Sequence, residues 1–307
     1  TFTDPRFDED EFQIGIQQIK AILPNIQKDP DFQFQIEKEK VFYNNNPRVL
    51  ALNDELLTKA NLATVERVYR ELFKDAAGAE VTIVGNVDLA ALKPLVEKYI
   101  GSLPKGKKAT DWIKENCISV ADGQVEKTVN IKMQDPKSTV HQLYTAYLPY
   151  DIKTGVTLDV ANYILDMIYT KTIREQEGGT YGVGAGLSAT RAPYSRVTFM
   201  VQFDTNPEQA EKLCGLTVKY LKELGQNGPT AEELAMAVEN LKKNIPESRI
   251  SNNYWMNCLS KNLQYGYDHD AEYEAALASV TAEDVKSLLQ AVFAQNNFVQ
   301  IILSPAE

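Results

Sequence analysis

The chain has 307 residues, of which 44% are hydrophobic and 24% are charged, so it has a globular composition and the length of about two domains. This composition excludes wholesale disorder, a collagen-like repeat and a disulfide-stabilised miniprotein. The 42 acidic residues outnumber the 32 basic ones, and a net charge of −10 repels a phosphate backbone. We therefore expect no nucleic-acid partner.

The first third of the chain reads as helices separated by one short strand. Apolar periodicity predicts helices near residues 36–43 and 61–73 and a strand at 81–84. Glycine, proline and lysine then mark residues 101–123 as a linker. No window approaches ~18 consecutive apolar residues, so no transmembrane segment is expected. The chain opens Thr-Phe-Thr-Asp-Pro, without a Met or an apolar leader, and we expect it to be a piece of a longer polypeptide.

The remainder of the chain predicts strands followed by helices. Apolar residues alternate with polar ones at 125–133 and 197–203, which is typical of half-buried strands. Capping-box patterns begin helices at Thr230 and Thr281. The helices predicted from apolar spacing are 158–172, 208–224, 231–244 and 281–293. Antiparallel strands with helices packed on one face make an α+β fold.

An internal repeat relates the two parts of the chain. Residues 61–73 align with residues 281–293 at a constant offset of 220 positions, and each helix is followed by a strand, at 81–84 and at 299–302. A weaker match joins the helix near 36–43 to the helix that begins at Ala231. The front half of the first copy has no counterpart, so we expect that copy to be truncated to its helical rear part.

A metal site is not encoded by the histidines or the cysteines. His269 and Glu272 spell H-x-x-E, one imidazole short of the H-x-x-E-H zinc signature. We expect His269 to lie in an exposed polar turn and His141, the only other histidine, to fill a strand position. The three cysteines are far apart and form no C-x-x-C pair, which predicts free thiols.

Two other kinds of site are disfavoured by their surroundings. Four glycines between Gly179 and Gly186 resemble a dinucleotide-binding loop, but they follow a helix and lead into a strand, the reverse of the required order. The chain has no G-x-S-x-G, and no cysteine has a recognisable nucleophile signature. We set nucleotide binding and nucleophilic catalysis aside.

The strongest candidate site lies where a helix runs into two glycines. Gly178 and Gly179 permit a tight turn, after which a strand would carry Tyr181 back over the helix end that holds Arg174. A guanidinium and a phenol both donate hydrogen bonds and can together hold a peptide carbonyl or an oxyanion. By spacing alone, the stronger interpretation is a basic residue that is favoured by the helix dipole before a glycine stop.

The segment that holds Arg174 and Tyr181 resembles a motif of a known protein family. The segment Arg174-Glu175-x-x-Gly178-x-x-Tyr181 resembles the R-E-x-x-G-L-A-Y segment of the M16 (pitrilysin-like, mitochondrial processing peptidase-like) zinc metallopeptidases. It departs from that pattern at Gly179-Thr180 and at Glu177, and it keeps the Arg and the Tyr. Three further segments resemble the family in the same order along the chain, Val84-Gly85-Asn86-Val87-Asp88, Lys98-Tyr99-Ile100-Gly101-Ser102-Leu103-Pro104 and Val280-Thr281-x-Glu283-Asp284-Val285.

The resemblance implies the C-terminal half of an M16 enzyme, built from two homologous α/β units. Residues 1–109 correspond to the rear part of a first unit, and residues 117–307 to a complete second unit. Family members carry zinc on an H-x-x-E-H motif in their N-terminal half, so no metal ligand transfers to this chain. Arg174 and Tyr181 transfer as contacts to the substrate carbonyl or oxyanion.

The first hypothesis is therefore a fragment of a zinc metalloendopeptidase that cleaves peptides and is inactive alone. Its partner would be an N-terminal M16 half, on the same polypeptide or on a separate subunit, and zinc would be the cofactor of the complete enzyme. The alternative is a non-catalytic M16-like partner or scaffold subunit.

Overall fold

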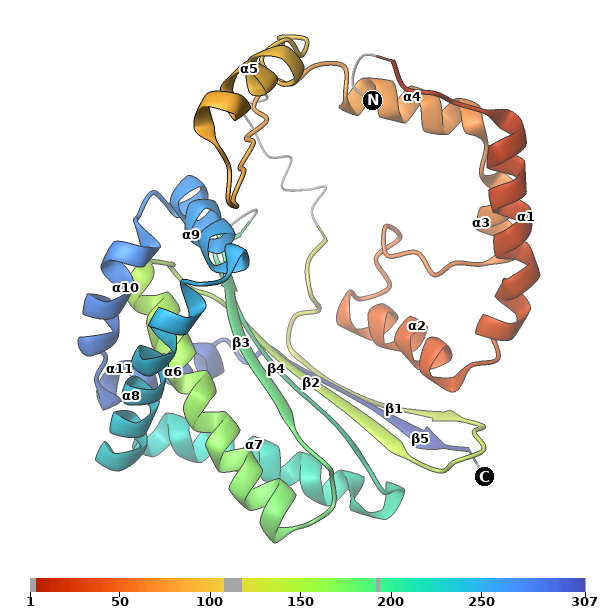
Figure 1. Ribbon diagram of the computed structural model, residues 1–307. Coiled ribbons are helices and arrows are strands. Elements are labelled where there is room, and N and C mark those ends of the chain that lie inside the picture. Colours follow the sequence, from red (N-terminus) through yellow and green to blue (C-terminus); the bar gives the residue numbers. More distant parts are fainter. Residues whose placement is uncertain (1–3, 108–117, 192–193, 307) are drawn as a thin grey trace. The chain divides into compact units, whose positions relative to one another are not determined.

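The computed structural model describes residues 4–107, 118–191 and 194–306 (Figure 1). The chain divides into two compact units. Unit 1 comprises Thr1–Phe32 and Leu50–Glu115, and unit 2 comprises Gln33–Val49 and Asn116–Glu307. Residues 33–49 thus group with the second unit although they precede most of the first in sequence.

All the regular secondary structure among the described residues of unit 1 is helical, and irregular segments connect the helices. Each helix begins at an Asp or Asn whose side chain accepts a hydrogen bond from a backbone N–H of the first turn, as N-caps do. The helix predicted at 61–73 is confirmed. The helices are α1 (Glu9–Ile26), α3 (Asp54–Lys59), α4 (Leu62–Leu72) and α5 (Leu89–Tyr99).

The strand predicted at residues 81–84 is wrong for this chain. The segment has no strand structure, and Val81 and Ile83 are 57% and 44% exposed. A strand exists only when its backbone N–H and C=O groups pair with a neighbouring strand, and none of the described strands lies in unit 1. The local sequence favours an extended backbone here, but the described residues of unit 1 contain no strand with which this segment could pair.

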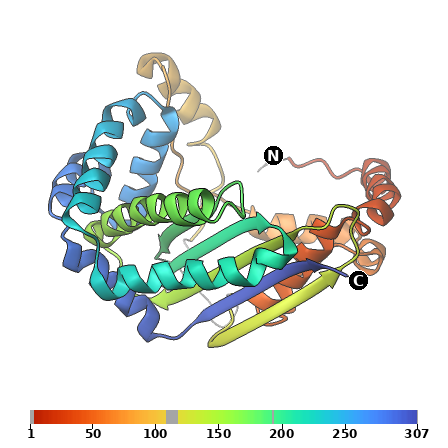
Figure 2. The ribbon, with the colours of Figure 1, turned by 90° about the horizontal axis from the view of Figure 1, so that it is seen from below.

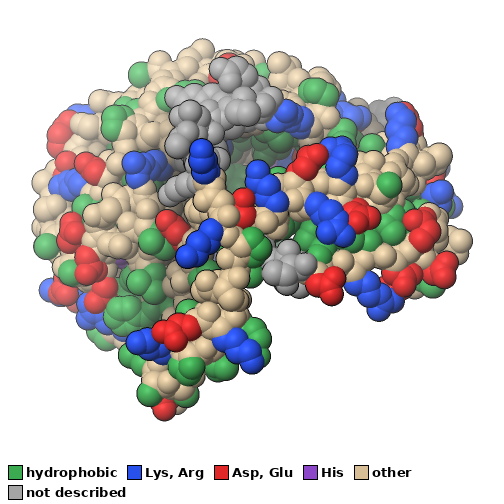
Figure 3. All heavy atoms as spheres, turned by 90° about the horizontal axis from the view of Figure 1, so that it is seen from above, with side chains coloured by type: hydrophobic (Ala, Val, Ile, Leu, Met, Phe, Trp, Pro, Cys, Tyr) green, Lys and Arg blue, Asp and Glu red, His purple; other side chains and the backbone are tan. Residues whose placement is uncertain are grey.

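The apolar face of α4 is also exposed to solvent. Val65 and Leu72 are 46% and 70% exposed, whereas their repeat counterparts Val285 and Val292 are almost completely buried in unit 2. Apolar side chains are visible between the charged ones on the face shown in Figure 3. The repeat therefore places the same amphipathic helix in two environments, one covered by a sheet and one uncovered.

Unit 2 is built on a five-stranded mixed sheet in the order β1-β5-β2-β4-β3. β1 pairs with β5 in parallel, and the other neighbours are antiparallel. The sheet and its helices confirm the α+β class. The strands are β1 (Gln124–Ile131), β2 (Ser138–Tyr147), β3 (Gly184–Thr190), β4 (Arg196–Thr205) and β5 (Phe298–Pro305).

Helices cover one face of this sheet and build the main core (Figures 1 and 2). α6 and α7 run across the sheet, and the side chains of β4 that face them, such as Phe199 and Val201, are buried. The predicted capping boxes at Thr230 and Thr281 are both present. The helices of this layer are α6 (Ile152–Tyr169), α7 (Ala210–Asn227), α8 (Ala231–Ser248), α9 (Asn252–Tyr265), α10 (His269–Ala278) and α11 (Ala282–Ala294).

α2 (Pro30–Phe42) supplies a second, smaller core on the opposite face of the sheet. Phe34 and Phe42 pack there with apolar residues of β5, whose side chains alternate between the two faces. His141 fills a strand position in β2, as predicted, and lies on this face of the sheet with its ring centroid 5.6 Å from that of Phe34. Its Nδ1 atom is buried and has no hydrogen-bond partner among the described residues.

The stability of unit 2 should depend on the protonation of His141. Its pKa is lowered from 6.5 to about 4, first because burial disfavours the charged imidazole and then because Lys38 lies nearby, with Asp204 acting in the opposite direction. Between about pH 6.5 and about pH 4 the unfolded chain binds a proton that the native chain does not. The free energy of unfolding should therefore fall as the pH is lowered through this window, by about 3 kcal/mol for this residue.

Urea unfolding of the wild type and of His141→Gln at about pH 7 and about pH 4.5 measures this effect. The variant should lose less stability than the wild type between the two pH values. If both proteins lose the same free energy of unfolding, His141 is already charged in the native state at about pH 4.5.

Candidate functional site

The candidate site begins where α6 changes from an α-helix to a π-helix. Residues Thr170–Gln176 continue α6 as a π-helix, a rare form that occurs mostly as single turns and often at functional sites. Ile173 is fully buried beneath this segment, and Arg174 is exposed on it. The Arg174 guanidinium makes no hydrogen bond or ion pair with any other side chain in the described part of the chain.

A tightly held glycine turn follows. Gly178 has φ +63°, a conformation that favours glycine. Gly179 is buried, and a Cβ there would meet Gln209 Oε1 at 2.1 Å and Leu213 Cδ1 at 3.0 Å. Its carbonyl oxygen accepts a 2.6 Å hydrogen bond from the Thr205 hydroxyl. The turn is therefore packed against β4 and the start of α7, and a side chain at position 179 would displace Gln209 and Leu213.

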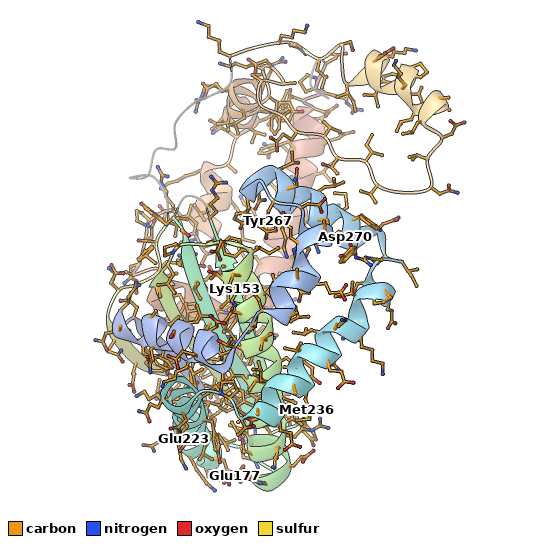
Figure 4. All side chains as sticks on the ribbon, turned by 90° about the vertical axis from the view of Figure 1, so that its left-hand side faces the viewer. Lys153, Glu177, Glu223, Met236, Tyr267 and Asp270 are labelled. Atoms are coloured by element: carbon orange, nitrogen blue, oxygen red, sulfur yellow. The ribbon has the colours of Figure 1, made fainter. Side chains whose placement is uncertain are left out.

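Two further contacts hold the residues beside this turn. Lys212 on α7 forms an ion pair with Glu177, which precedes the glycines and is labelled in Figure 4. The Thr180 hydroxyl donates to the Gly182 carbonyl oxygen at 2.9 Å. Tyr181 lies between these residues, and its side chain is 101% exposed. An aromatic ring is thus presented entirely to solvent from a turn that is fixed on both sides.

Tyr181 lines a groove of about 420 Å³ together with the glycine turn and residues at the ends of two strands. Asp204 and Asn206 border it at the end of β4, and Lys137 borders it just before β2. Asp204 accepts a 2.6 Å hydrogen bond from Thr139 and lies 3.7 Å from the Lys137 ammonium. The groove therefore offers a phenol, an amide and a carboxylate that already has two partners.

The two residues predicted from sequence occupy neighbouring but different parts of this region. Tyr181 lines the groove, and Arg174 is not among the residues that line it. The guanidinium and the phenol make no contact with each other in the described structure. Their convergence on one carbonyl oxygen, which the sequence suggests, stays a prediction.

The H-x-x-E pair does not form a metal site. Glu272 accepts a hydrogen bond from the Asp268 backbone N–H at 3.0 Å instead of facing His269. His269 is not in an exposed turn, and that prediction was wrong. It begins α10 and is 9% exposed, because the ring of Tyr273 and the side chain of Lys261 cover it.

Within the described residues, no group of three or more His, Cys, Asp or Glu side chains could hold a metal ion. Cys214 and Cys258 are free and buried, and Cys117 lies outside the described residues. The residues of the described structure therefore do not fit a zinc centre. No helix in the described part of the chain is both long and apolar enough to cross a membrane.

Sequence reasoning missed the residues that hold the turn. Thr205 and Gln209 contact Gly179 from 26 and 30 positions further along the chain, and neither lies in a motif. The only local sign was the Gly178-Gly179 pair, which indicates a turn without naming its supports.

Comparison with known proteins places these features in a family. The family model described as the peptidase M16 inactive domain matches residues 59–241. The probable zinc protease PqqL of Escherichia coli is 25% identical over 280 residues, which cover 89% of this chain and 29% of that protein. The chain thus spans less than a third of the length of that relative.

Two solved structures share the fold. The periplasmic protease PqqL from Escherichia coli superposes with a TM-score of 0.79 at 21% identity, covering 97% of this chain and 33% of that one. A peptidase M16 inactive domain from Pseudomonas fluorescens gives a TM-score of 0.76, also at 21% identity, covering 99% of this chain and 73% of that one. Since the family model covers more than half of the sequence, this chain belongs to the peptidase M16 family, and the domain that it matches is the inactive-domain type.

Proposed function

We propose that this chain is the C-terminal part of a zinc metalloendopeptidase and contributes Arg174 and Tyr181 to peptide binding there. Zinc would be held by an N-terminal M16 half, since the described residues of this chain offer no cluster of ligands. The family membership and the similarity to a probable zinc protease support this proposal.

The single observation that carries the proposal is the presentation of Tyr181. A tyrosine that is 101% exposed contributes no buried area to folding, yet its turn is fixed by Thr205 and by the packed Gly179. A rigid turn loses little conformational entropy when a ligand binds to it. A phenol and a guanidinium held in this way can donate hydrogen bonds to the carbonyl oxygens of an extended peptide, and these bonds strengthen when an oxygen gains negative charge.

The same proposal divides the chain into residues 1–109, the rear part of a first M16-like unit, and residues 117–307, a complete second unit. The exposed apolar face of α4 and the unpaired segment 81–84 support it, because the apolar face of α11 is buried in the core of unit 2 and β5 pairs with two strands of the sheet. We infer that a sheet from a polypeptide segment outside these residues covers α4 and pairs with 81–84.

The zinc-bearing half would lie on the same polypeptide or on a separate subunit. The coverage of 29% of the Escherichia coli relative is consistent with the first arrangement. The alternative, a non-catalytic partner or scaffold subunit, requires no function for Arg174 and Tyr181, so substitution of these two residues distinguishes the two hypotheses.

In the complete enzyme, Tyr181→Phe should lower kcat by about 10²-fold, because it removes one donor to the developing oxyanion. Arg174→Lys should also lower kcat, since it keeps the charge and loses the planar fork of donors. The melting temperature should not change in either variant, since both side chains are exposed. Peptide hydrolysis and thermal unfolding are measured on the same samples.

Tyr99→Phe and Arg67→Lys are matched controls, because both residues are exposed and neither is among the residues that line the groove. They should keep wild-type turnover. If Tyr181→Phe and Arg174→Lys also keep wild-type turnover, the proposed role of these two residues in catalysis is refuted and the scaffold alternative is supported.

Hydrogen exchange tests the proposal about the first unit. In this chain the backbone amides of residues 81–84 should exchange freely, because no strand among the described residues pairs with them. In the complete protein the same amides should be protected by about 10²-fold or more, as partners in a sheet are. The amides of β5 provide the internal control and should be protected in both samples. Free exchange of residues 81–84 in the complete protein would mean that no sheet forms there.

A further inference from the structure

A second cavity lies in unit 2 near the opposite end of α6 from the glycine turn. It has a volume of about 210 Å³ and is bounded by the first turns of α6, the middle of β3, and α9 and α10. Figure 4 shows Tyr267, which lines it, far from Glu177 beside the glycine turn. At 1.5 Å per residue, the 18-residue helix α6 separates the two places by about 27 Å.

Opposite charges line this cavity without forming an ion pair. Asp159 on α6 and Lys261 on α9 attract each other electrostatically, but no direct contact joins them in the described structure. Burial raises the pKa of Asp159 and lowers the pKa of Lys261. Each charge is therefore held in a poorly solvated place where a partner of opposite charge would stabilise it.

Neither charged group is fully satisfied by its neighbours in the described structure. The Tyr273 hydroxyl donates to Asp159 Oδ2 at 3.0 Å, and Asp159 Oδ1 has no hydrogen-bond partner within the described residues. The Lys261 ammonium lies 3.3 Å from His269 Nε2 and 3.5 Å from Nδ1. Burial and Lys261 lower the pKa of His269 to about 4, so this ring is neutral at neutral pH and does not compensate the charge of the ammonium.

The rest of the wall combines two tyrosine hydroxyls with an apolar floor. Tyr150 and Tyr267 lie with their hydroxyl oxygens 3.2 Å apart, so one of the two hydroxyl hydrogens remains available to a ligand. A Cβ at Gly155 would meet the Tyr150 hydroxyl at 2.6 Å, and glycine costs about 1 kcal/mol relative to alanine within a helix. Val156 and Leu187 provide apolar surface beside these polar groups.

The geometry points to a binding site for a free α-amino acid with an apolar side chain. Lys261 would bind the α-carboxylate, with a tyrosine hydroxyl as a further donor. Asp159 would bind the α-ammonium group through its free oxygen, and the side chain would contact Val156 and Leu187. The cavity is smaller than the ~300–1,000 Å³ clefts that take drug-sized ligands, which suits one amino acid better than a peptide segment. This inference rests on the cavity alone and is independent of the role of Arg174 and Tyr181.

Calorimetric titration of the chain with L-leucine, L-valine and L-alanine tests the proposal. Binding should be seen for at least one of them. It should weaken at least tenfold when the ammonium is masked, as in N-acetyl-leucine, and when the carboxylate is masked, as in leucine amide. The absence of binding for all three amino acids at millimolar concentrations would overturn the proposal, and so would equal binding of the parent and both masked compounds.

Variants locate the binding in this cavity. Asp159→Asn and Lys261→Met should each weaken binding at least tenfold. Asp166→Asn, on an exposed part of α6, and Lys171→Met, on the π-helical segment, are matched controls that should bind as the wild type does. Unchanged binding in Asp159→Asn and Lys261→Met would place the amino acid elsewhere and refute this site. If either variant fails to fold, the masked ligands on the wild-type chain still decide whether both charged groups of the amino acid are required.

Discussion

The burial of α6 is the constraint on which the rest of unit 2 depends. Val160, Ala161, Ile164 and Leu165 are completely buried between the sheet and the outer helices. Burying large apolar side chains contributes about 1.5–3 kcal/mol each, so a shift of this helix along its axis would lose much of the core. With its middle fixed, both ends of α6 acquire defined positions. One end carries Arg174 and leads into the glycine turn, and the other places Gly155 and Asp159 on the wall of the small cavity.

Buried polar groups fix the register of the layers around this helix. Tyr169 on α6 donates to the Thr217 carbonyl oxygen at 3.0 Å, and the Thr217 hydroxyl donates to Gln142 Oε1 at 2.7 Å. The Gln142 amide in turn donates to Gln300 Oε1 at 2.8 Å. These bonds connect α6, α7, β2 and β5, and each would leave an unsatisfied buried group if one layer slid past another. The positions of Arg174 and Tyr181 follow from this register.

The sequence predicted the elements of the fold well because their signals are local. Capping boxes, apolar periodicity and strand alternation depend on residues a few positions apart, and α4, α8, α11, β1 and β4 lie where these patterns predict them. The errors at residues 81–84 and at His269 concern burial and strand pairing, which depend on distant parts of the chain. A segment such as Val81-Thr82-Ile83-Val84 has high strand propensity, but propensity does not provide a partner strand.

The candidate site was accessible from sequence only in part, for the same reason. Arg174 and Tyr181 were identified by resemblance to a family motif, since their spacing alone favours a helix stop. Thr205, Gln209 and Lys212 hold the turn from β4 and the start of α7, and the cavity beside Gly155 joins α6 to α9 and α10. No pattern in the sequence pairs these residues, because the fold and not the local sequence brings them together.

At this site the residues that stabilise the turn differ from the residue that is available for binding. Thr205 is buried and bonded to the Gly179 carbonyl, so its loss would disturb the turn and the end of β4 together. Tyr181 makes no contribution of that kind, since its side chain is wholly in solvent. A ring that adds nothing to folding and is carried on a rigid turn has its energetic effect only when another molecule covers it. The turn is therefore already ordered by folding, so a ligand that binds to it does not have to supply the free energy of ordering it.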